Sequence, residues 1–342
     1  MSQPLRLRLD GDALASNWRW LRAQGGRAAC GAAVKADGYG LGAHEVVTRL
    51  AGVGCRDFFV ATYAEAAALG RMPEGCSLSV LHGPREEDMR AALSSGARPT
   101  INSVEQAARW RQTGRSCDVM IDTGMNRLGL RPAETFAVAD LQVVTLMSHL
   151  ACADEEHSAN VRQRDAFAAL DLPAERRSLA NSAGVCLGSD YAFDLTRPGL
   201  ALYGGVPRAE AAGHIRQVAF PEAQIVQRRR VEAGEGVGYG GTFVASQPVE
   251  VAILNIGYAD GYARAFSSVG SAGAARLPVL GRVSMDLLAI DVSAEPGLRE
   301  GDWVAIDYDL PSASEASGVS QYELLTRLGS RFERCWRNVA PQ

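Results

Sequence analysis

The chain has 342 residues, of which 47% are hydrophobic and 22% are charged, and its formal net charge is −4. This balance is ordinary for a globular enzyme and gives no reason to expect a nucleic acid or an anionic membrane as a partner. The sequence contains no run of about 18 apolar residues and no hydrophobic signal core near its start, so it predicts a cytoplasmic protein.

Cysteine and histidine spacing argues against a disulfide framework and against a metal centre. The seven cysteines have no C-x-x-C spacing, and the five histidines have no H-E-x-x-H spacing. We therefore expect buried apolar thiols and no catalytic metal.

The predicted elements begin with an extended strand at residues 5–9, where leucine and arginine alternate strictly. A helix follows, for which Asp12 is a plausible N-cap. Short apolar runs then alternate with helical patterns. Eight runs read as strands, at residues 30–35, 57–62, 77–83, 98–103, 118–124, 143–149, 177–182 and 194–199. This alternation predicts an α/β fold, either a (β/α)8 TIM-type barrel or a doubly wound open sheet.

Polar residues lie at or just beyond the C-terminal ends of these runs. They are Lys35, His82, Arg127, His149, Ser182 and Arg197. A barrel gathers the C-terminal ends of its strands around one mouth, whereas an open sheet spreads them. The barrel is therefore the favoured architecture.

A second domain is indicated from about residue 218 onward. Glycine-punctuated extended runs at 251–256, 277–283, 287–292 and 303–308 replace the helical spacing there. We predict a barrel over residues 1–217 and a smaller, mostly β domain over residues 218–342, with the strand at 5–9 as a candidate addition to the second sheet.

Lys35 is the first candidate for chemistry, because it ends an apolar strand and precedes the sharp turn D-G-Y-G. A buried amine is costly unless it is paired or used covalently, and desolvation lowers its pKa as imine formation requires. These features also fit an aldolase-type lysine without a cofactor, or a lysine that extends to solvent.

The segment A-V-K-A-D-G-Y-G at 33–40 closely resembles the lysine motif of the alanine racemase branch of fold-type III pyridoxal-phosphate enzymes. Further motifs follow in the order of that family. They are I-D-T-G-M-N-R-L-G at 121–129, S-H-L-A at 148–151, R-P-G-L-A-L-Y-G at 197–204, V-G-Y-G-G-T-F at 237–243, G-Y-A-D-G-Y at 257–262 and R-V-S-M-D at 282–286. The resemblance implies interconversion of L- and D-alanine with pyridoxal 5'-phosphate, for synthesis of D-alanine for a bacterial cell wall or for its degradation.

The resemblance also assigns the acid/base groups. Lys35 is the cofactor-binding lysine and one proton-transferring group, and Tyr239 is the other, on the opposite face of a planar carbanion. His149 hydrogen-bonds the tyrosine and links it to Arg197 on the cofactor ring. A permanent cation at the ring nitrogen weakens the electron sink and limits side reactions.

The remaining site residues are implied in the same way. The phosphate is bound by Tyr39, Ser182 and the backbone N–H groups of Gly199 and Leu200. The substrate is contacted by Arg127, Met285, Asp286 and Tyr258. In this family the second domain reaches the barrel of the other subunit, so the resemblance implies a head-to-tail homodimer with shared active sites.

The chain departs from the family at two positions. Many relatives carry a carbamylated lysine where this sequence has Met120, so another group must orient Arg127. Some relatives carry a phosphate-binding tyrosine at the position that corresponds to Ser330.

Three alternatives differ from this interpretation. A serine or broad-specificity racemase of the same family fits, because an apolar pocket discriminates weakly against one added hydroxyl. A fold-type III decarboxylase requires a cysteine acid in the second domain, where only Cys335 lies beyond Cys186. A non-catalytic pyridoxal-phosphate carrier lacks the β domain.

Overall fold

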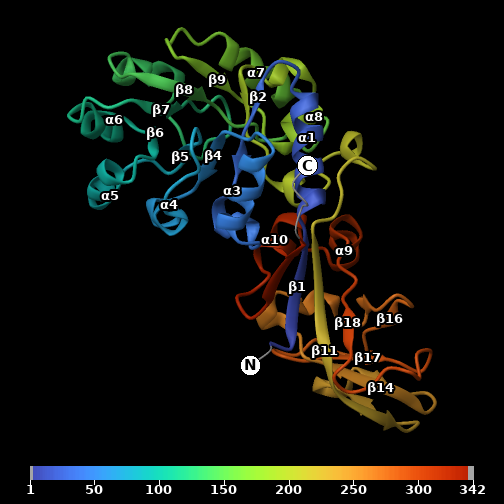
Figure 1. The fold of residues 1–342 in the computed structure, drawn as a ribbon. Coiled ribbons are helices and arrows are strands. Elements are labelled where there is room, and N and C mark those ends of the chain that lie inside the picture. Colours follow the sequence, from blue (N-terminus) through green and yellow to red (C-terminus); the bar gives the residue numbers. More distant parts are fainter. Residues whose placement is uncertain (1–2, 338–342) are drawn as a thin grey trace. The chain divides into compact units, whose positions relative to one another are not determined.

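The computed structural model describes residues 3–337, and the chain forms two compact units (Figure 1). The barrel unit comprises Leu14–Leu202 and Val206–Arg216. The β unit comprises the described residues up to Ala13, the segment Tyr203–Gly205, and the described residues from Gln217 onward.

The barrel unit is built on parallel strands that pair in chain order. Seven of them form one sheet: β3 (Ala32–Ala33), β4 (Asp57–Val60), β5 (Ser77–Val80), β6 (Arg98–Ile101), β7 (Cys117–Met120), β8 (Val143–Met147) and β9 (Arg176–Ser178). The eighth, β10 (Leu195–Thr196), pairs in parallel with β2 (Ala29–Cys30), which directly precedes β3.

Hydrogen bonds on both sides of β10 close this sheet into a barrel. The amides of Ala29, Gly31 and Ala33 donate to carbonyls of residues 194, 196 and 198, each at 2.9 Å. On the other side, Arg197 N donates to Ala180 O at 2.8 Å. A Cβ at Gly31 would lie 2.8 Å from Asp57 O, so a glycine is needed where β2 passes into β3. The predicted barrel is confirmed, and the open sheet was the wrong alternative.

Helices alternate with these strands. They are α1 (Gly11–Gln24), α3 (Ala43–Gly52), α4 (Tyr63–Leu69), α5 (Met89–Ser94), α6 (Val104–Arg111), α7 (Ser158–Ala168) and α8 (Ser182–Cys186). The predicted N-cap of α1 was wrong: Asp10 Oδ1 accepts from Ala13 N at 2.9 Å, and Asp12 lies within the first turn. The helix begins at Gly11, which makes Asp10 the flanking residue.

The N-terminal ends of the barrel strands carry a charged network. Arg176 donates two hydrogen bonds to Asp57, at 2.8 and 3.1 Å. The fully buried Asp118 accepts from Ser79 Oγ at 2.5 Å, Thr145 N at 3.0 Å and Arg98 Nε at 3.3 Å. In barrels of this kind the N-terminal face contributes stability rather than chemistry.

The β unit contains a mixed sheet in the order β17 (Leu288–Asp291), β14 (Val249–Leu254), β11 (Ala219–Val231), β1 (Leu5–Asp10) and β19 (Glu333–Arg337), with β18 (Trp303–Ala305) also on β11. The N-terminal strand β1 therefore lies in this sheet, antiparallel to β11 and parallel to β19. Its leucines are buried, and Arg6 and Arg8 pair with the carboxylate of Glu222.

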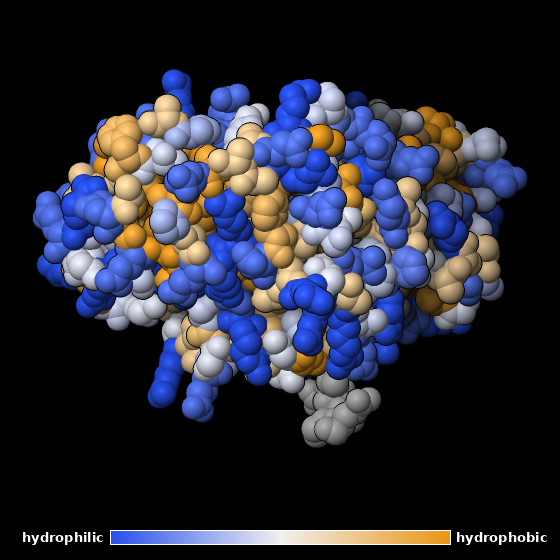
Figure 2. Space-filling model, turned by 90° about the horizontal axis from the view of Figure 1, so that it is seen from above, coloured by the Kyte–Doolittle hydropathy of each residue, from blue (hydrophilic) through white to orange (hydrophobic). Residues whose placement is uncertain are grey.

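Short elements complete the β unit. They are the hairpins β12 (Gly236–Val237) with β13 (Phe243–Val244) and β15 (Ser271–Ala272) with β16 (Leu277–Pro278), and the helices α9 (Leu310–Ser317) and α10 (Gln321–Thr326). In Figure 2 hydrophilic residues cover much of the visible surface, with hydrophobic residues between them. Within residues 3–337 no helix has the length and apolar character needed to cross a membrane.

Candidate active site

Lys35 follows the last residue of β3 by two positions and starts a left-handed turn. The segment Lys35–Tyr39 (α2) is wound with the opposite hand from an α-helix, since φ is 52° at Ala36, 53° at Asp37, 62° at Gly38 and 55° at Tyr39. Such a conformation costs roughly 1–2 kcal/mol for each residue other than glycine. Hydrogen bonds must therefore hold the turn, and one of them joins Ala43 N to Asp37 Oδ1 at 2.8 Å.

The Lys35 amine lies in a partly buried, electropositive setting. Burial lowers the pKa of Lys35, the charge of Arg127 lowers it further, and the charge of Glu65 opposes both. A lowered pKa increases the fraction of neutral amine, which is the nucleophilic form.

His149 and Arg197 belong to the same neighbourhood. Burial lowers the pKa of His149 to about 3, and the charges of Arg197, Arg127 and Lys35 act in the same direction. Its imidazole is therefore neutral at pH 7. The structure thus brings Lys35, Arg127, His149 and Arg197 together at the C-terminal ends of the barrel strands.

Arg197 is buried and held by two acceptors. One terminal nitrogen donates to Ser148 O at 2.6 Å, and the other donates to Ser178 Oγ. Burial lowers the pKa of Arg197 to about 10, with Asp118 opposing the shift. The side chain is consequently a fixed cation at neutral pH.

The predicted phosphate-binding residues also lie together. Ser182 Oγ accepts from Gly199 N at 2.9 Å and from Ala201 N at 3.2 Å, so the Gly199 N–H already has an acceptor. A Cβ at Gly199 would overlap the Tyr39 hydroxyl and lie 2.8 Å from its Cζ. Tyr39, Ser182 and Leu200 are all buried. Two hydroxyls beside a bare glycine backbone suit a phosphate group.

Asp122 shapes the loop that carries Arg127. Its Oδ1 accepts from Gly124 N and Met125 N, both at 2.8 Å, and its Oδ2 accepts from Arg127 N at 3.2 Å. Across residues 3–337, no hydrogen bond or ion pair reaches the Arg127 guanidinium. It is exposed and lines an open pocket of about 620 Å³, where it is accessible to an anion.

Met120 occupies an apolar setting inside the barrel. It forms a buried cluster with Phe59, Met147 and Leu195. A Cβ at Gly129 would lie 3.0 Å from Met120 Cγ, so the thioether packs against the returning arm of the Arg127 loop. The loop is thus supported by Asp122 and by the apolar packing of Met120, which stands where many relatives carry a carbamylated lysine.

His82 does not join the site, although it follows a barrel strand. Its side chain is exposed, and its carbonyl accepts from Gln106 Nε2 at 3.0 Å. Its charge acts on Asp88 rather than on Lys35 or His149.

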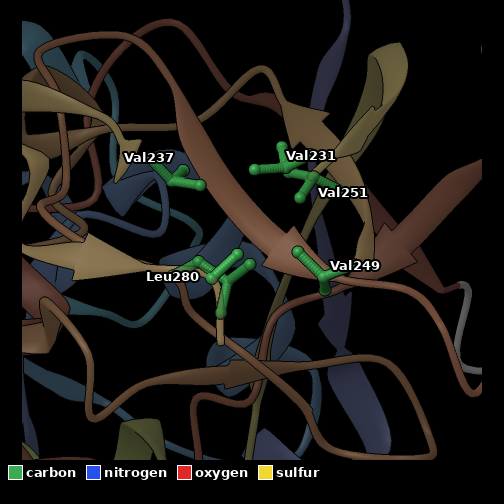
Figure 3. Packing of buried hydrophobic residues seen from close by; sticks show 6 residues of the cluster. Val231, Val237, Val249, Val251 and Leu280 are labelled. Atoms are coloured by element: carbon green, nitrogen blue, oxygen red, sulfur yellow. The ribbon is translucent and has the colours of Figure 1, made fainter. Parts of the chain in front are cut away.

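The β unit presents the other predicted residues on its own surface. Tyr239, Tyr258 and Met285 are 67%, 39% and 53% exposed and line a pocket of about 310 Å³. Tyr239 begins a turn between β12 and β13. Val237 of that hairpin belongs to a buried core with Val231, Val249, Val251 and Leu280 (Figure 3), together with Ala245.

Two arginines that sequence reasoning missed share this pocket. Arg264 places its Cζ 5.1 Å from the centroid of the Tyr258 ring. Arg282 lies beside the Tyr239 turn, with its guanidinium 3.6 Å from where a Cβ at Gly240 would be. The sequence motifs could have identified both arginines, because Arg282 is the first residue of R-V-S-M-D and Arg264 follows G-Y-A-D-G-Y by two residues.

Asp286 is tied to the Tyr258 loop through Arg331. Arg331 donates to Asp286 Oδ1 at 2.7 Å and to Asp260 Oδ1 at 2.6 Å. Asp260 is fully buried and accepts from Gly257 N at 3.0 Å. Ser330, which precedes Arg331, is exposed.

Comparison with known proteins gives matches over nearly the whole chain. The family models "Alanine racemase, N-terminal domain" and "Alanine racemase, C-terminal domain" match residues 9–207 and 218–336. The catabolic alanine racemase of Mesorhizobium japonicum is 41% identical, over 96% of this chain and 92% of that protein. The biosynthetic alanine racemase of Agrobacterium fabrum is 39% identical, over 97% and 93%. The solved alanine racemase of Bartonella henselae, with covalently bound pyridoxal phosphate, matches at a TM-score of 0.90 and 33% identity, over 98% of this chain and all of that one.

Proposed function

Because the chain belongs to the alanine racemase family, we propose that it interconverts L- and D-alanine with pyridoxal phosphate held on Lys35, and that Lys35 and Tyr239 move the protons. The observation that carries this proposal is the setting of Lys35. Its pKa is lowered by burial and by Arg127, and it shares the barrel mouth with a neutral His149 and a cationic Arg197.

The residues present fit the cofactor. Tyr39, Ser182 and the backbone at Gly199 and Leu200 would hold its phosphate, and Arg197 would face its ring nitrogen. When bound, the cofactor supplies an electron-withdrawing ring that acidifies the hydrogen on the substrate α-carbon. Arg197 limits that withdrawal, because a fixed cation disfavours protonation of the ring.

Proton transfer on two opposite faces requires two groups. Lys35 Nζ would remove or return a proton on one face, and Tyr239 Oη would serve the other. A neutral His149 can accept a hydrogen bond from a tyrosine hydroxyl and so keep the phenol oriented.

We further propose that Tyr239, Tyr258, Met285 and Asp286 serve the partner subunit of a head-to-tail homodimer. The barrel unit would then bind the cofactor, and the β unit would complete the partner's site. Support comes from the exposure of Tyr239, Tyr258 and Met285 around one pocket, since exposed aromatic and apolar side chains grouped together mark interaction surfaces.

The substrate carboxylate would be met by Arg127. Alanine is the substrate named for the relatives, and serine is the second candidate, because one added hydroxyl is poorly excluded by an apolar pocket. A coupled assay across alanine, serine, lysine and arginine tests this directly. Turnover of serine at a kcat/KM equal to or above that of alanine would overturn the assignment.

The cellular role is either the supply of D-alanine for the cell wall or its degradation, and the relatives carry both names. We propose the cytoplasm as its compartment. Growth of a D-alanine auxotroph expressing the chain tests the biosynthetic role, and cell fractionation tests the location.

Mixed dimers test the shared site most sharply. Lys35→Ala and Tyr239→Phe homodimers should both be inactive. When the two variants are co-expressed and pair at random, about half of the dimers are heterodimers. Each heterodimer carries one intact site of two, so the mixture should recover roughly a quarter of wild-type activity. No recovery in verified heterodimers would refute a site shared between subunits.

A further inference from the structure

Glu65 joins the turn that follows Lys35 to the end of the neighbouring strand. Its Oε1 accepts from Ala36 N at 2.8 Å, and its Oε2 accepts from Ala61 N at 2.7 Å. Ala36 is the residue after the lysine, and Ala61 is the residue after β4. One carboxylate therefore fixes two strand exits of the barrel mouth to each other.

The geometry of the turn explains why such a bridge is needed. Ala36, Asp37 and Tyr39 all have positive φ, which is unfavourable for residues with a Cβ. Ala36 is the second residue of the turn, and the first N–H groups of a helical segment have no partner within it. An acceptor outside the turn must satisfy that donor, and Glu65 is this acceptor.

Gln106 occupies the position in α6 that matches Glu65 in α4, but one end of its side chain donates a hydrogen bond where Glu65 accepts one. Glu65 follows the cap Thr62 of α4 by three residues, as Gln106 follows the cap Ser103 of α6. Gln106 Oε1 accepts from Asn102 N at 2.8 Å, just as Glu65 accepts from Ala61 N. The other end of Gln106 donates to His82 O at 3.0 Å.

The two positions thus differ in the backbone group that follows the neighbouring strand and faces the side chain. After β5 this group is a carbonyl, so an amide side chain with one donor and one acceptor fits. After β3 it is the N–H of Ala36, so two acceptors are required. Of these two side chains, only the carboxylate supplies both.

We propose that Glu65 is a positioning residue for Lys35, which holds the left-handed turn and thereby the direction in which the amine enters the site. This inference rests on the proposed role of Lys35 as the cofactor-binding lysine. Glu65 acts through backbone amides, and its charge has a second effect, because it opposes the lowering of the Lys35 pKa by burial and by Arg127.

Reciprocal substitutions separate positioning from simple stability. Glu65→Gln turns an acceptor into a donor facing Ala36 N–H, and Gln106→Glu turns a donor into an acceptor facing His82 O. Each loses one hydrogen bond of the same kind, so both should lower the melting temperature by similar amounts.

Only Glu65→Gln should alter the lysine. In apoprotein mixed with pyridoxal phosphate, followed by absorbance, attachment to Lys35 should slow about tenfold, because misplacing a reacting group is costly. The pH midpoint of attachment should move to lower pH, since loss of the carboxylate charge lowers the amine pKa. Arg127 and His149 remain in place, and Gln106→Glu should leave both rate and midpoint unchanged.

Hydrogen exchange gives a readout that needs no cofactor. In the apoprotein, a peptide covering residues 35–42 should exchange faster in Glu65→Gln and at the wild-type rate in Gln106→Glu. If Glu65→Gln fails to fold, hydrogen exchange of the wild-type protein still tests the proposal. Slow exchange of the Ala36 amide supports its hydrogen bond to Glu65. Exchange at the rate of an open loop contradicts it.

The outcomes distinguish the two proposals. If borohydride labels wild-type Lys35 and Glu65→Gln matches Gln106→Glu in rate, midpoint and exchange, the positioning role is wrong and the proposed function stands. If borohydride fixes no cofactor to Lys35, which is the only lysine in the sequence, the proposed function itself fails.

Discussion

The hydroxyl of Ser182 accepts a hydrogen bond from the backbone N–H of Gly199 at 2.9 Å. Ser182 begins α8, and Gly199 follows β10, so the bond ties two neighbouring strand exits of the barrel. Tyr39 reaches the same point from the lysine turn, with its hydroxyl against the Gly199 backbone. Three segments distant in sequence thus meet at the point where we propose that the cofactor phosphate binds.

Gly199→Ala should weaken pyridoxal phosphate binding about tenfold or more, because the new Cβ overlaps the Tyr39 hydroxyl in a packed site. Absorbance titration of the apoprotein measures the dissociation constant. Gly52→Ala is the matched control, because a Cβ there meets nothing within 4 Å. Unchanged affinity in Gly199→Ala would remove Gly199 from the phosphate site.

Asp122→Asn should raise the KM for alanine roughly tenfold with a smaller change in kcat, because the amide can no longer accept from Arg127 N while its oxygen still serves Gly124 and Met125. Steady-state kinetics in both directions measures the split. Asp171→Asn, at an exposed carboxylate, is the control. If kcat falls while KM stays unchanged, Asp122 does not act by orienting Arg127 toward the substrate.

Arg331→Gln should lower the free energy of unfolding by about 1–2 kcal/mol, because it leaves the buried Asp260 without its cation while half-exposure of Arg331 limits the loss. KM should rise as well, since Arg331 joins the loops bearing Tyr258 and Asp286. Urea denaturation and kinetics measure both. Arg327→Gln, which breaks an exposed pair with Glu323, should change stability by no more than about 0.5 kcal/mol.

Asp57 should make stability depend on pH in the acid range. Burial alone would raise its pKa, but the hydrogen bonds and charge of Arg176, with Ser77, outweigh burial and hold the pKa below its usual value. A carboxyl with a lowered folded pKa stabilises the protein above its unfolded pKa of about 3.9, and this stabilisation is lost as pH falls through the folded pKa.

Asp57→Asn should therefore be less stable than wild type at pH 7, and the difference should shrink below about pH 4. Urea denaturation at a series of pH values measures the free energy of unfolding. A difference that stays constant down to about pH 2.5, well below the unfolded pKa, would mean that the substitution acts through packing rather than through charge.

Local patterns in the sequence determined the elements and much of the candidate site. The eight apolar runs predicted the barrel strands, because burial on both faces selects short continuous apolar segments. The alternating leucines at 5–9 likewise predicted a strand with one buried face. The motifs around Lys35, Arg127, His149 and Arg197 indicated four side chains that the fold brings into one electrostatic neighbourhood.

Other relationships were decided only by the tertiary structure. The backbone after Lys35 is left-handed, a state that Ala36 and Asp37 do not favour by themselves and that Glu65 stabilises from 29 residues away. The close approach of the Tyr39 hydroxyl to Gly199, and the bridge from Arg331 to Asp260, likewise join segments remote in sequence. Periodicity and capping reflect interactions among residues that are near one another in the sequence. These contacts depend instead on which segments become neighbours within the closed barrel, and on which become neighbours within the β unit.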